Sequence, residues 1–243
     1  MSLPSNSLIR LLYRTSTSLL SSFVSMILSA YQSTLDFQFE GEEHILRQEA
    51  LGKNYLLVVW HSFVDAALFA LYSRRLVVYS DHPRIPAYEK SIAHYFREVG
   101  LKTLRAYGYD VVDASLGKQS AGIIEYMKKI KEGIPALISP DGPNGPIYEA
   151  KPGTIYIGAK TDSAIIPVGF GFSRKITGPN WDDFCIPLPF SRVVVVFGEP
   201  IRPPEKPDEE TQKEYSIILE HTLDKLCFRA SELARTEFNA DAL

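Results

Sequence analysis

Residues 55–65 read YLLVVWHSFVD, and this segment gives the clearest indication of the fold. Its first six residues are all apolar and include two β-branched valines, a pattern typical of a strand that is buried on both faces of a sheet. Polar side chains appear directly after that strand, at His61 and Ser62, and again at Asp65. Because the residues that carry chemistry in α/β proteins gather where strands end, this segment predicts both a central strand and a candidate site.

Short apolar segments and amphipathic segments alternate along the rest of the chain. Strands are expected at 55–60, 76–79, 110–112, 135–139, 165–172 and 193–197, and helices at 66–72, 86–99, 120–131, 153–161 and 208–238. This alternation predicts an α/β fold, with a mostly parallel mixed sheet flanked by helices. Without a repeat or a long linker, the sequence predicts one α/β domain over residues 36–243, preceded by a separate helix within residues 1–35.

Composition excludes several classes of protein. The chain has 243 residues, of which 45% are hydrophobic and 23% charged, as in ordinary folded proteins. A net charge of −3 offers no electrostatic attraction for nucleic acid. Two cysteines are too few for a disulfide framework or a cysteine-rich metal site, and no metal is expected.

The N-terminal segment has the length of a membrane span but an unusual composition. No charged residue occurs between positions 15 and 35, a run of 21 residues, yet ten of these are Ser or Thr. At helical spacing, one face collects Leu20, Phe23, Val24, Ile27 and Tyr31, and another collects serines 18, 22, 25, 29 and 33.

Several interpretations of this helix are open. The interleaved serines argue against a secretory signal. A helix packed into the protein core and a full membrane span are both alternatives. The pattern favours a helix at the membrane interface, which predicts a protein held on the cytoplasmic face of the cell membrane, peripherally or by this single helix.

Two strand ends carry candidate functional residues. After the first strand, His61 precedes Asp65 by four positions, an arrangement in which a carboxylate can fix one imidazole nitrogen and leave the other free as a base. After the strand at 135–139, residues 139–146 read SPDGPNGP, a stiff loop able to present Ser139, Asp141 and Gly142 to a polar ligand. The alternative interpretations are that His61 has only a structural role and that residues 139–146 form a plain tight turn.

Together these segments resemble the lysophospholipid/glycerol-phosphate acyltransferase family over roughly residues 51–204. His61 stands where that family has its catalytic histidine, and residues 139–142 stand where it has Pro-Glu-Gly. Residues 165–170 (IIPVGF) match its late Ile-Pro-Val strand. The strings 181–184 (WDDF), 186–191 (IPLPFS) and 193–200 are most similar to an uncharacterised bacterial branch of the family, which is also similar to lipid A acyltransferases.

The resemblance implies transfer of a fatty acyl group from acyl-CoA or acyl-carrier protein to a hydroxyl of a lipid-like acceptor, with His61 as general base, paired with Asp65, and no cofactor. The chain departs from the family in two places. His61 and Asp65 are one residue closer than the family motif has them, and Asp113 replaces an arginine that would bind a glycerol phosphate. Asp113 and Lys118 are therefore expected in the acceptor site, and the acceptor is expected not to be a simple glycerol phosphate.

Two other functions remain alternatives at this level. A non-catalytic lipid-binding or membrane-interaction protein could retain the fold with a degraded motif, and the short His61–Asp65 spacing favours it. A doubly wound nucleotide-binding enzyme is disfavoured, because no Gly-x-Gly-x-x-Gly loop follows the first strand.

Overall fold

A computed structural model describes residues 7–80, 92–114 and 119–236. Its centre is a seven-stranded sheet in the order β1-β9-β6-β2-β5-β3-β4, and β7 and β8 form a separate two-stranded hairpin. The strands are β1 (Asp36–Glu40), β2 (Tyr55–Val58), β3 (Val77–Ser80), β4 (Asp110–Asp113), β5 (Ala136–Ile138), β6 (Ala164–Phe172), β7 (Lys175–Thr177), β8 (Cys185–Pro187) and β9 (Arg192–Phe197).

The sheet is mixed and mostly parallel, as the sequence predicts. Neighbouring strands run parallel from β6 through β2, β5 and β3 to β4, and β1 runs parallel to β9. The only antiparallel pair in the described sheet is β6 with β9. All six predicted strands are therefore confirmed, and the carboxyl ends of β2 to β6 share one edge of the sheet.

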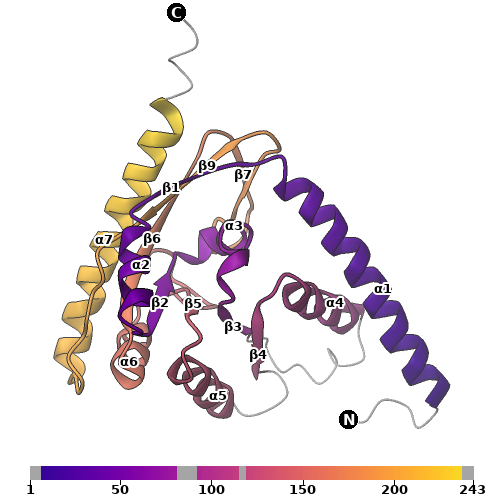
Figure 1. Cartoon of the computed structure of the whole chain (residues 1–243), viewed down its shortest axis with the longest axis horizontal. Helices are drawn as coiled ribbons and strands as arrows, with labels where there is room; N and C mark the ends of the chain where they lie inside the picture. Colours follow the sequence, from indigo (N-terminus) through magenta and orange to yellow (C-terminus); the bar gives the residue numbers. More distant parts are fainter. Residues whose placement is uncertain (1–6, 81–91, 115–118, 237–243) are drawn as a thin grey trace, which may run out of the picture.

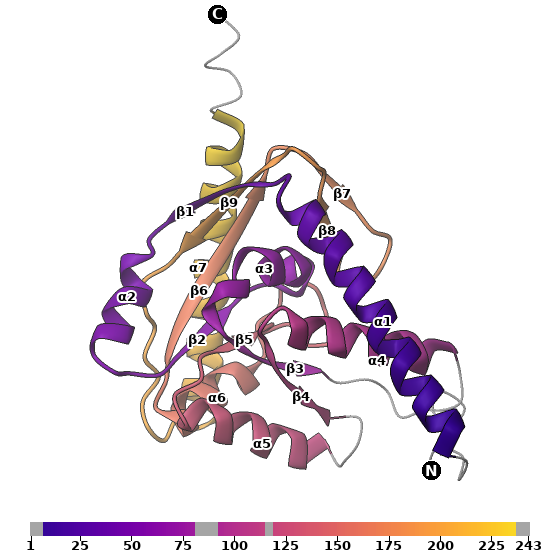
Figure 2. The same ribbon diagram turned by 45° about the vertical axis from the view of Figure 1, so that its right-hand side comes forward.

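Helices cover both faces of the sheet (Figures 1 and 2). They are α1 (Ser7–Gln32), α2 (Glu43–Ala50), α3 (Val64–Ala70), α4 (Ile92–Ala106), α5 (Gln119–Lys131), α6 (Pro152–Thr161) and α7 (Glu209–Thr236). Helices α5, α6 and α7 pack in sequence beside one another, and α7 lies along β6 and β9. The crossovers that contain α3 and α4 advance along the sheet in the opposite direction, which places these helices on the other face.

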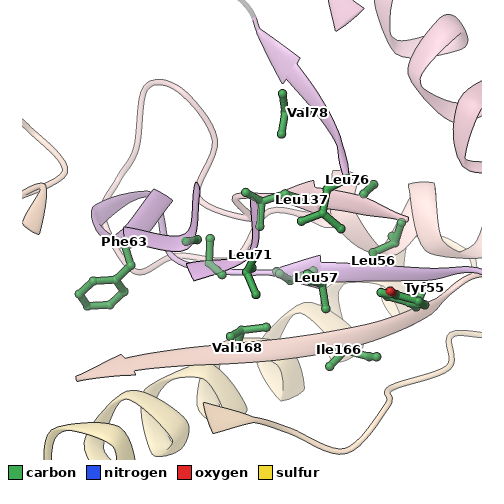
Figure 3. Close-up of a cluster of buried hydrophobic side chains, with 14 of the residues drawn as sticks. Tyr55, Leu56, Leu57, Phe63, Leu71, Leu76, Val78, Leu137, Ile166 and Val168 are labelled. Atoms are coloured by element: carbon green, nitrogen blue, oxygen red, sulfur yellow. The ribbon is translucent and has the colours of Figure 1, made fainter. Parts of the chain in front are cut away.

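The core is built around β2, the strand formed by the first residues of the YLLVVW segment. Leu56, Leu57 and Val58 are completely buried, because β2 is paired on both edges and covered on both faces. Figure 3 shows their neighbours Leu137 on β5 and Ile166 on β6 pointing into the same cluster. This continuous apolar packing fixes the position of β2 and therefore of the residues that follow it.

Helix α7 packs on β6 at very short range, which two glycines make possible. A Cβ atom at Gly169 would lie 2.3 Å from the main-chain carbon of Leu226, and one at Gly171 would lie 2.1 Å from the carbonyl oxygen of Ala230. The backbone of the helix thus rests directly on the backbone of the strand. Only glycine leaves room for this contact.

Several elements differ from the sequence-based expectations. Helix α4 continues through Gly100 to Ala106, although the glycine was expected to end it, because the helix packs along α1 and β4. The expected start of that helix at Pro86 lies outside the described residues. Strand β1, helix α2 and the β7–β8 hairpin were not predicted at all.

Helix α1 is confirmed as a helix, and it buries two of its hydroxyl side chains against the protein. Thr17 and Ser21 are buried against α4, where the Ser21 and Thr103 hydroxyls lie 3.2 Å apart and Lys102 Nζ donates to Thr17 Oγ1 over 2.6 Å. Large apolar side chains are instead exposed along the opposite side; they are Leu11, Leu12, Leu19, Phe23, Met26 and Ile27. We call these six residues the outer apolar stripe of α1.

The predicted apolar face of α1 is divided by this packing. Leu20, Val24 and Tyr31 are half-buried toward the protein, whereas Phe23 and Ile27 belong to the outer apolar stripe. Within the described residues, no helix combines the length and the apolar character needed to cross a membrane.

Candidate functional site

The candidate site lies at the sheet edge where the parallel strands end. His61 follows β2, Asp113 ends β4, Asp141 follows β5, and the loop that leads from β7 to β8 brings Asp182 to the same edge. The first three were expected here from the sequence. The sequence marks Asp182 only as part of the WDDF string, which predicts no contact with the other three.

His61 opens a 3₁₀ turn (His61–Phe63) directly after the buried strand. Its Nδ1 lies 2.7 Å from Oδ2 of Asp182, and its side chain is 35% exposed. The indole ring of Trp181 lies against the imidazole, with 5.0 Å between the ring centroids. When the Nδ1 proton is donated to Asp182, the lone pair of Nε2 is left available to accept a proton.

Asp141 is hydrogen-bonded to the main chain of His61 and does not face solvent. Its side chain is completely buried, and its Oδ1 accepts a hydrogen bond of 3.0 Å from the backbone N–H of His61. Burial raises the pKa of the Asp141 carboxyl above its ordinary value, and the hydrogen bond from His61 opposes that shift. The sequence predicted that Asp141 contacts a ligand. In the structure its carboxylate instead anchors the loop to the start of the 3₁₀ turn.

Asp65 makes no hydrogen bond to His61 within the described residues, so the predicted pair is not formed. The 3₁₀ turn ends at Phe63 and α3 starts at Val64, which places Asp65 in the first turn of the helix. Desolvation raises the pKa of the Asp65 carboxyl; the charge of His61 opposes this shift and the charge of Asp182 adds to it. Asp65 therefore senses the charge of the imidazole but does not orient it through a hydrogen bond.

Asp65 instead lines a cavity of about 350 Å³ between α1, α3 and α4. Most of the lining is apolar, and it includes Leu28, Leu68, Leu101 and Leu104. The cavity therefore extends from Asp65, in the helix that follows His61, to the inner side of α1.

Asp113 is already paired in the structure. The buried guanidinium of Arg97, on α4, donates a hydrogen bond to Asp113 Oδ1, and the side chains are only 4% and 9% exposed. This corrects the expectation of a free carboxylate that repels phosphate and accepts hydrogen bonds from the acceptor. Sequence spacing could not show the pairing, because Arg97 reaches Asp113 from a different element.

The remaining predicted residues are placed as follows. Ser139 and Gly142 form the turn after β5, where the Gly142 N–H donates to the Ser139 carbonyl over 3.2 Å and Gly142 adopts a φ of +68°. Lys118 lies outside the described residues. Across the described part of the chain, no three His, Cys, Asp or Glu residues are grouped in a way that could hold a metal ion.

Comparisons with known proteins give limited matches. No protein-family model matches the chain. An uncharacterised protein of Rickettsia prowazekii (strain Madrid E) is 29% identical over 96 residues, which cover 39% of this chain and 44% of that protein. Among solved structures, the 1-acyl-sn-glycerophosphate (LPA) acyltransferase PlsC of Thermotoga maritima is similar with a TM-score of 0.48 and 17% identity, over 92% of this chain and 84% of that chain.

Proposed function

We propose that the protein is an O-acyltransferase that moves a fatty acyl group from an acyl thioester to a hydroxyl group of a lipid-like acceptor. The observation that carries this proposal is the 2.7 Å hydrogen bond between His61 and a buried carboxylate, at a sheet edge where the His61 side chain is 35% exposed. The order of the motifs along the sequence, from His61 to the Ile-Pro-Val strand, supports the same reaction.

In this reaction, Nε2 of His61 takes the proton of the acceptor hydroxyl while the hydroxyl oxygen attacks the thioester carbonyl. The tetrahedral intermediate then collapses, the carbon–sulfur bond breaks, and the leaving thiolate takes a proton back from the imidazolium. The products are an ester and a free thiol. A thioester is already activated, so a positioned base supplies what the reaction lacks, and the proposed donors are acyl-CoA and acyl-carrier protein.

The apolar cavity beside His61 suits the acyl chain of the donor or of the acceptor. Its leucines provide a dry surface for a hydrocarbon chain, and Asp65 marks the end of the cavity that lies toward the imidazole. Such an arrangement would hold the chain inside the protein and its reacting end near Nε2.

We further propose that the outer apolar stripe of α1 rests on the membrane surface. Six large apolar side chains exposed along one helix form a face that water does not favour, while the polar side of the helix is used for packing against α4. A lipid acceptor would then be reached at the cytoplasmic face of the membrane, next to the helix that borders the cavity.

To test the acyltransferase proposal, purified protein is mixed with a pool of lysolipids and with a long-chain acyl thioester, either acyl-CoA or acylated acyl-carrier protein. Acceptor-dependent release of free thiol, with a new acylated lipid seen by mass spectrometry, is the expected result. His61→Ala should lower the turnover number by about 10²–10⁴-fold with the fold intact. His221→Ala is the matched control, because His221 is exposed on α7.

Two results would contradict the proposal. Full turnover in His61→Ala would exclude His61 as the base. Retention of lipid binding without any thiol release from either donor would favour the alternative, a lipid-binding protein that performs no chemistry.

A further inference from the structure

We propose that Asp182 is the positioning residue of this site, and that the β7–β8 hairpin supplies the carboxylate that orients His61. The inference rests on the proposed role of His61 as base. It places the residue that orients His61 in the WDDF string (residues 181–184), whereas the sequence predicted Asp65 for this role.

The contact between Asp182 and His61 has the features of an orienting interaction. Asp182 is 6% exposed, and its Oδ2 lies 2.7 Å from Nδ1, the nitrogen that faces away from the reacting atoms in the proposed reaction. A carboxylate is an acceptor only, so Nδ1 carries the proton in this contact, and in the neutral imidazole Nε2 then carries the lone pair. The same carboxylate would stabilise the imidazolium that forms when Nε2 takes a proton.

Asp182 is held in place by the residue next to His61. The Ser62 hydroxyl, which is completely buried, donates a hydrogen bond to the main-chain carbonyl of Asp182. Consecutive residues of the 3₁₀ turn therefore contact the side chain and the main chain of Asp182. Oδ1 of Asp182 is buried without a hydrogen-bond partner among the described residues, so His61 is the partner on which the buried carboxylate depends.

Trp181 joins this loop to the loop that contains Asp141. Its indole packs on the imidazole of His61 and also lies over Gly145, where a Cβ atom would be 2.7 Å from Cε3 of the indole. The absence of a side chain at Gly145 thus allows the indole of Trp181 to lie against the loop at 139–146, and Asp182 is the next residue along the chain. This contact limits the ways in which the imidazole can rotate.

The loop that carries Asp182 is closed at its base, and the hairpin is also bonded to α1. Gly178 N–H donates to the Phe184 carbonyl over 2.9 Å, and β7 pairs with β8. The Tyr31 hydroxyl of α1 donates to the Pro187 carbonyl over 2.5 Å. Asp182 is therefore positioned by ordered structure and not by a free loop, as an orienting residue requires.

Asp65 does not meet these conditions. It is exposed, lines the cavity from the first turn of α3, and makes no hydrogen bond to the imidazole among the described residues. The proposal therefore predicts different effects for the same isosteric substitution at the two aspartates.

The experiment compares Asp182→Asn, Asp65→Asn and Asp183→Asn by NMR of protein labelled with ¹⁵N-histidine. His61 signals are assigned with His61→Gln, since the chain has five histidines. Wild type should show His61 as the tautomer protonated at Nδ1, and Asp182→Asn should lose this signature. Asp183→Asn is the matched control, because the neighbouring Asp183 is exposed. The backbone ¹H–¹⁵N signals of the other four histidines and the melting temperature show whether each variant is folded.

The acyl-transfer assay gives a second, separate readout. Asp182→Asn should lower kcat on the order of 10²-fold with little change in KM, because the base is misoriented while substrate binding is retained. Asp65→Asn should lower kcat less than Asp182→Asn. Loss of the Nδ1–H signature in Asp65→Asn but not in Asp182→Asn would overturn the proposal, and so would an unchanged kcat in an active Asp182→Asn. If wild type transfers no acyl group, the proposed function fails, while the tautomer measurement still decides which carboxylate orients His61.

Discussion

At the scale of single residues, the buried carboxyl of Asp141 makes stability depend on pH. Its pKa is raised above the ordinary value of 3.8, because burial disfavours the charged form. The folded state therefore binds a proton more tightly than the unfolded state does. The contribution of Asp141 to stability is fully present below pH about 4 and is lost as pH rises through the higher folded-state pKa.

Asp141→Asn should remove this pH dependence. The asparagine keeps an oxygen that can accept the hydrogen bond from the His61 N–H but carries no charge. Relative to wild type, the variant should gain thermal stability as pH rises from about 4 to 7. Melting temperatures at a series of pH values measure this difference, with Asp183→Asn as an exposed control. A difference that is constant with pH would show that Asp141 has the same pKa in both states.

The residues of the site were predictable only where a local pattern points to them. His61 and Asp141 each follow an apolar strand directly, and both lie at the expected sheet edge. Asp182 is separated from His61 by 121 positions, and the length of the β7–β8 hairpin decides where its side chain lies. Spacing along the sequence could therefore nominate Asp65 as the partner but could not find Asp182. The buried pair of Arg97 and Asp113 was missed for the same reason.

At the scale of secondary-structure elements, the contact between α7 and β6 depends on glycine. Gly171→Ala would place a Cβ atom 2.1 Å from the carbonyl oxygen of Ala230, and the main chain must move to accept it. We expect a loss of about 1–3 kcal/mol in the free energy of unfolding. Denaturant unfolding measures this loss. Gly153→Ala is the control, because nothing lies within 4 Å of its Cβ position, and an equal loss in both variants would contradict the role given to the close contact.

A substitution in the outer apolar stripe of α1 can test whether these residues bind the membrane. Phe23 is 54% exposed, so Phe23→Glu should leave the melting temperature unchanged while weakening binding to anionic phospholipid vesicles. Burying an aromatic side chain contributes about 1.5–3 kcal/mol, which corresponds to a loss of at least about tenfold in vesicle affinity. Cosedimentation with vesicles measures it.

The control for this prediction adds the same charge elsewhere on the same helix. Ser22 is an exposed polar residue that lies at helical spacing between Leu19 and Met26 of the outer apolar stripe, so Ser22→Glu introduces the charge on the same face without removing apolar area. Equal weakening by Ser22→Glu and Phe23→Glu would show that charge, and not burial of the stripe, governs the interaction. No weakening in either variant would exclude α1 as the membrane contact.

Elements were predictable to the extent that they are apolar. The strands at the centre of the sheet are continuous apolar runs because both of their faces are covered. Strand β1 (DFQFE) has only a short alternating pattern and owes its place to pairing with β9, whose residues follow more than 150 positions later. Local sequence does not contain that partner. The inward polar face of α1 was equally hidden, since hydroxyl groups that pack on α4 look in the sequence like a solvated face.

At the scale of the whole molecule, the cavity lies between α3, the helix that follows His61, and the helix proposed to contact the membrane. It is bordered by α1 through Leu28, by α4 through Leu101 and Leu104, and by α3 through Asp65 beside His61. Figure 1 shows α1 and α4 side by side at one end of the molecule, with α7 at the other. A hydrocarbon chain in this cavity would therefore lie between the imidazole and the membrane-facing helix.

This arrangement predicts that the cavity limits the length of the acyl chain. Leu104→Trp adds an indole to a cavity of about 350 Å³, so the longest chains should no longer fit while shorter ones still do. In competition between acyl donors of increasing chain length, the variant should prefer shorter chains than wild type does, as read from the products by mass spectrometry. Leu46→Trp, at an exposed position on α2, should keep the wild-type preference. If Leu104→Trp lowers turnover equally for every chain length, the acyl chain lies elsewhere and the cavity has only a structural role.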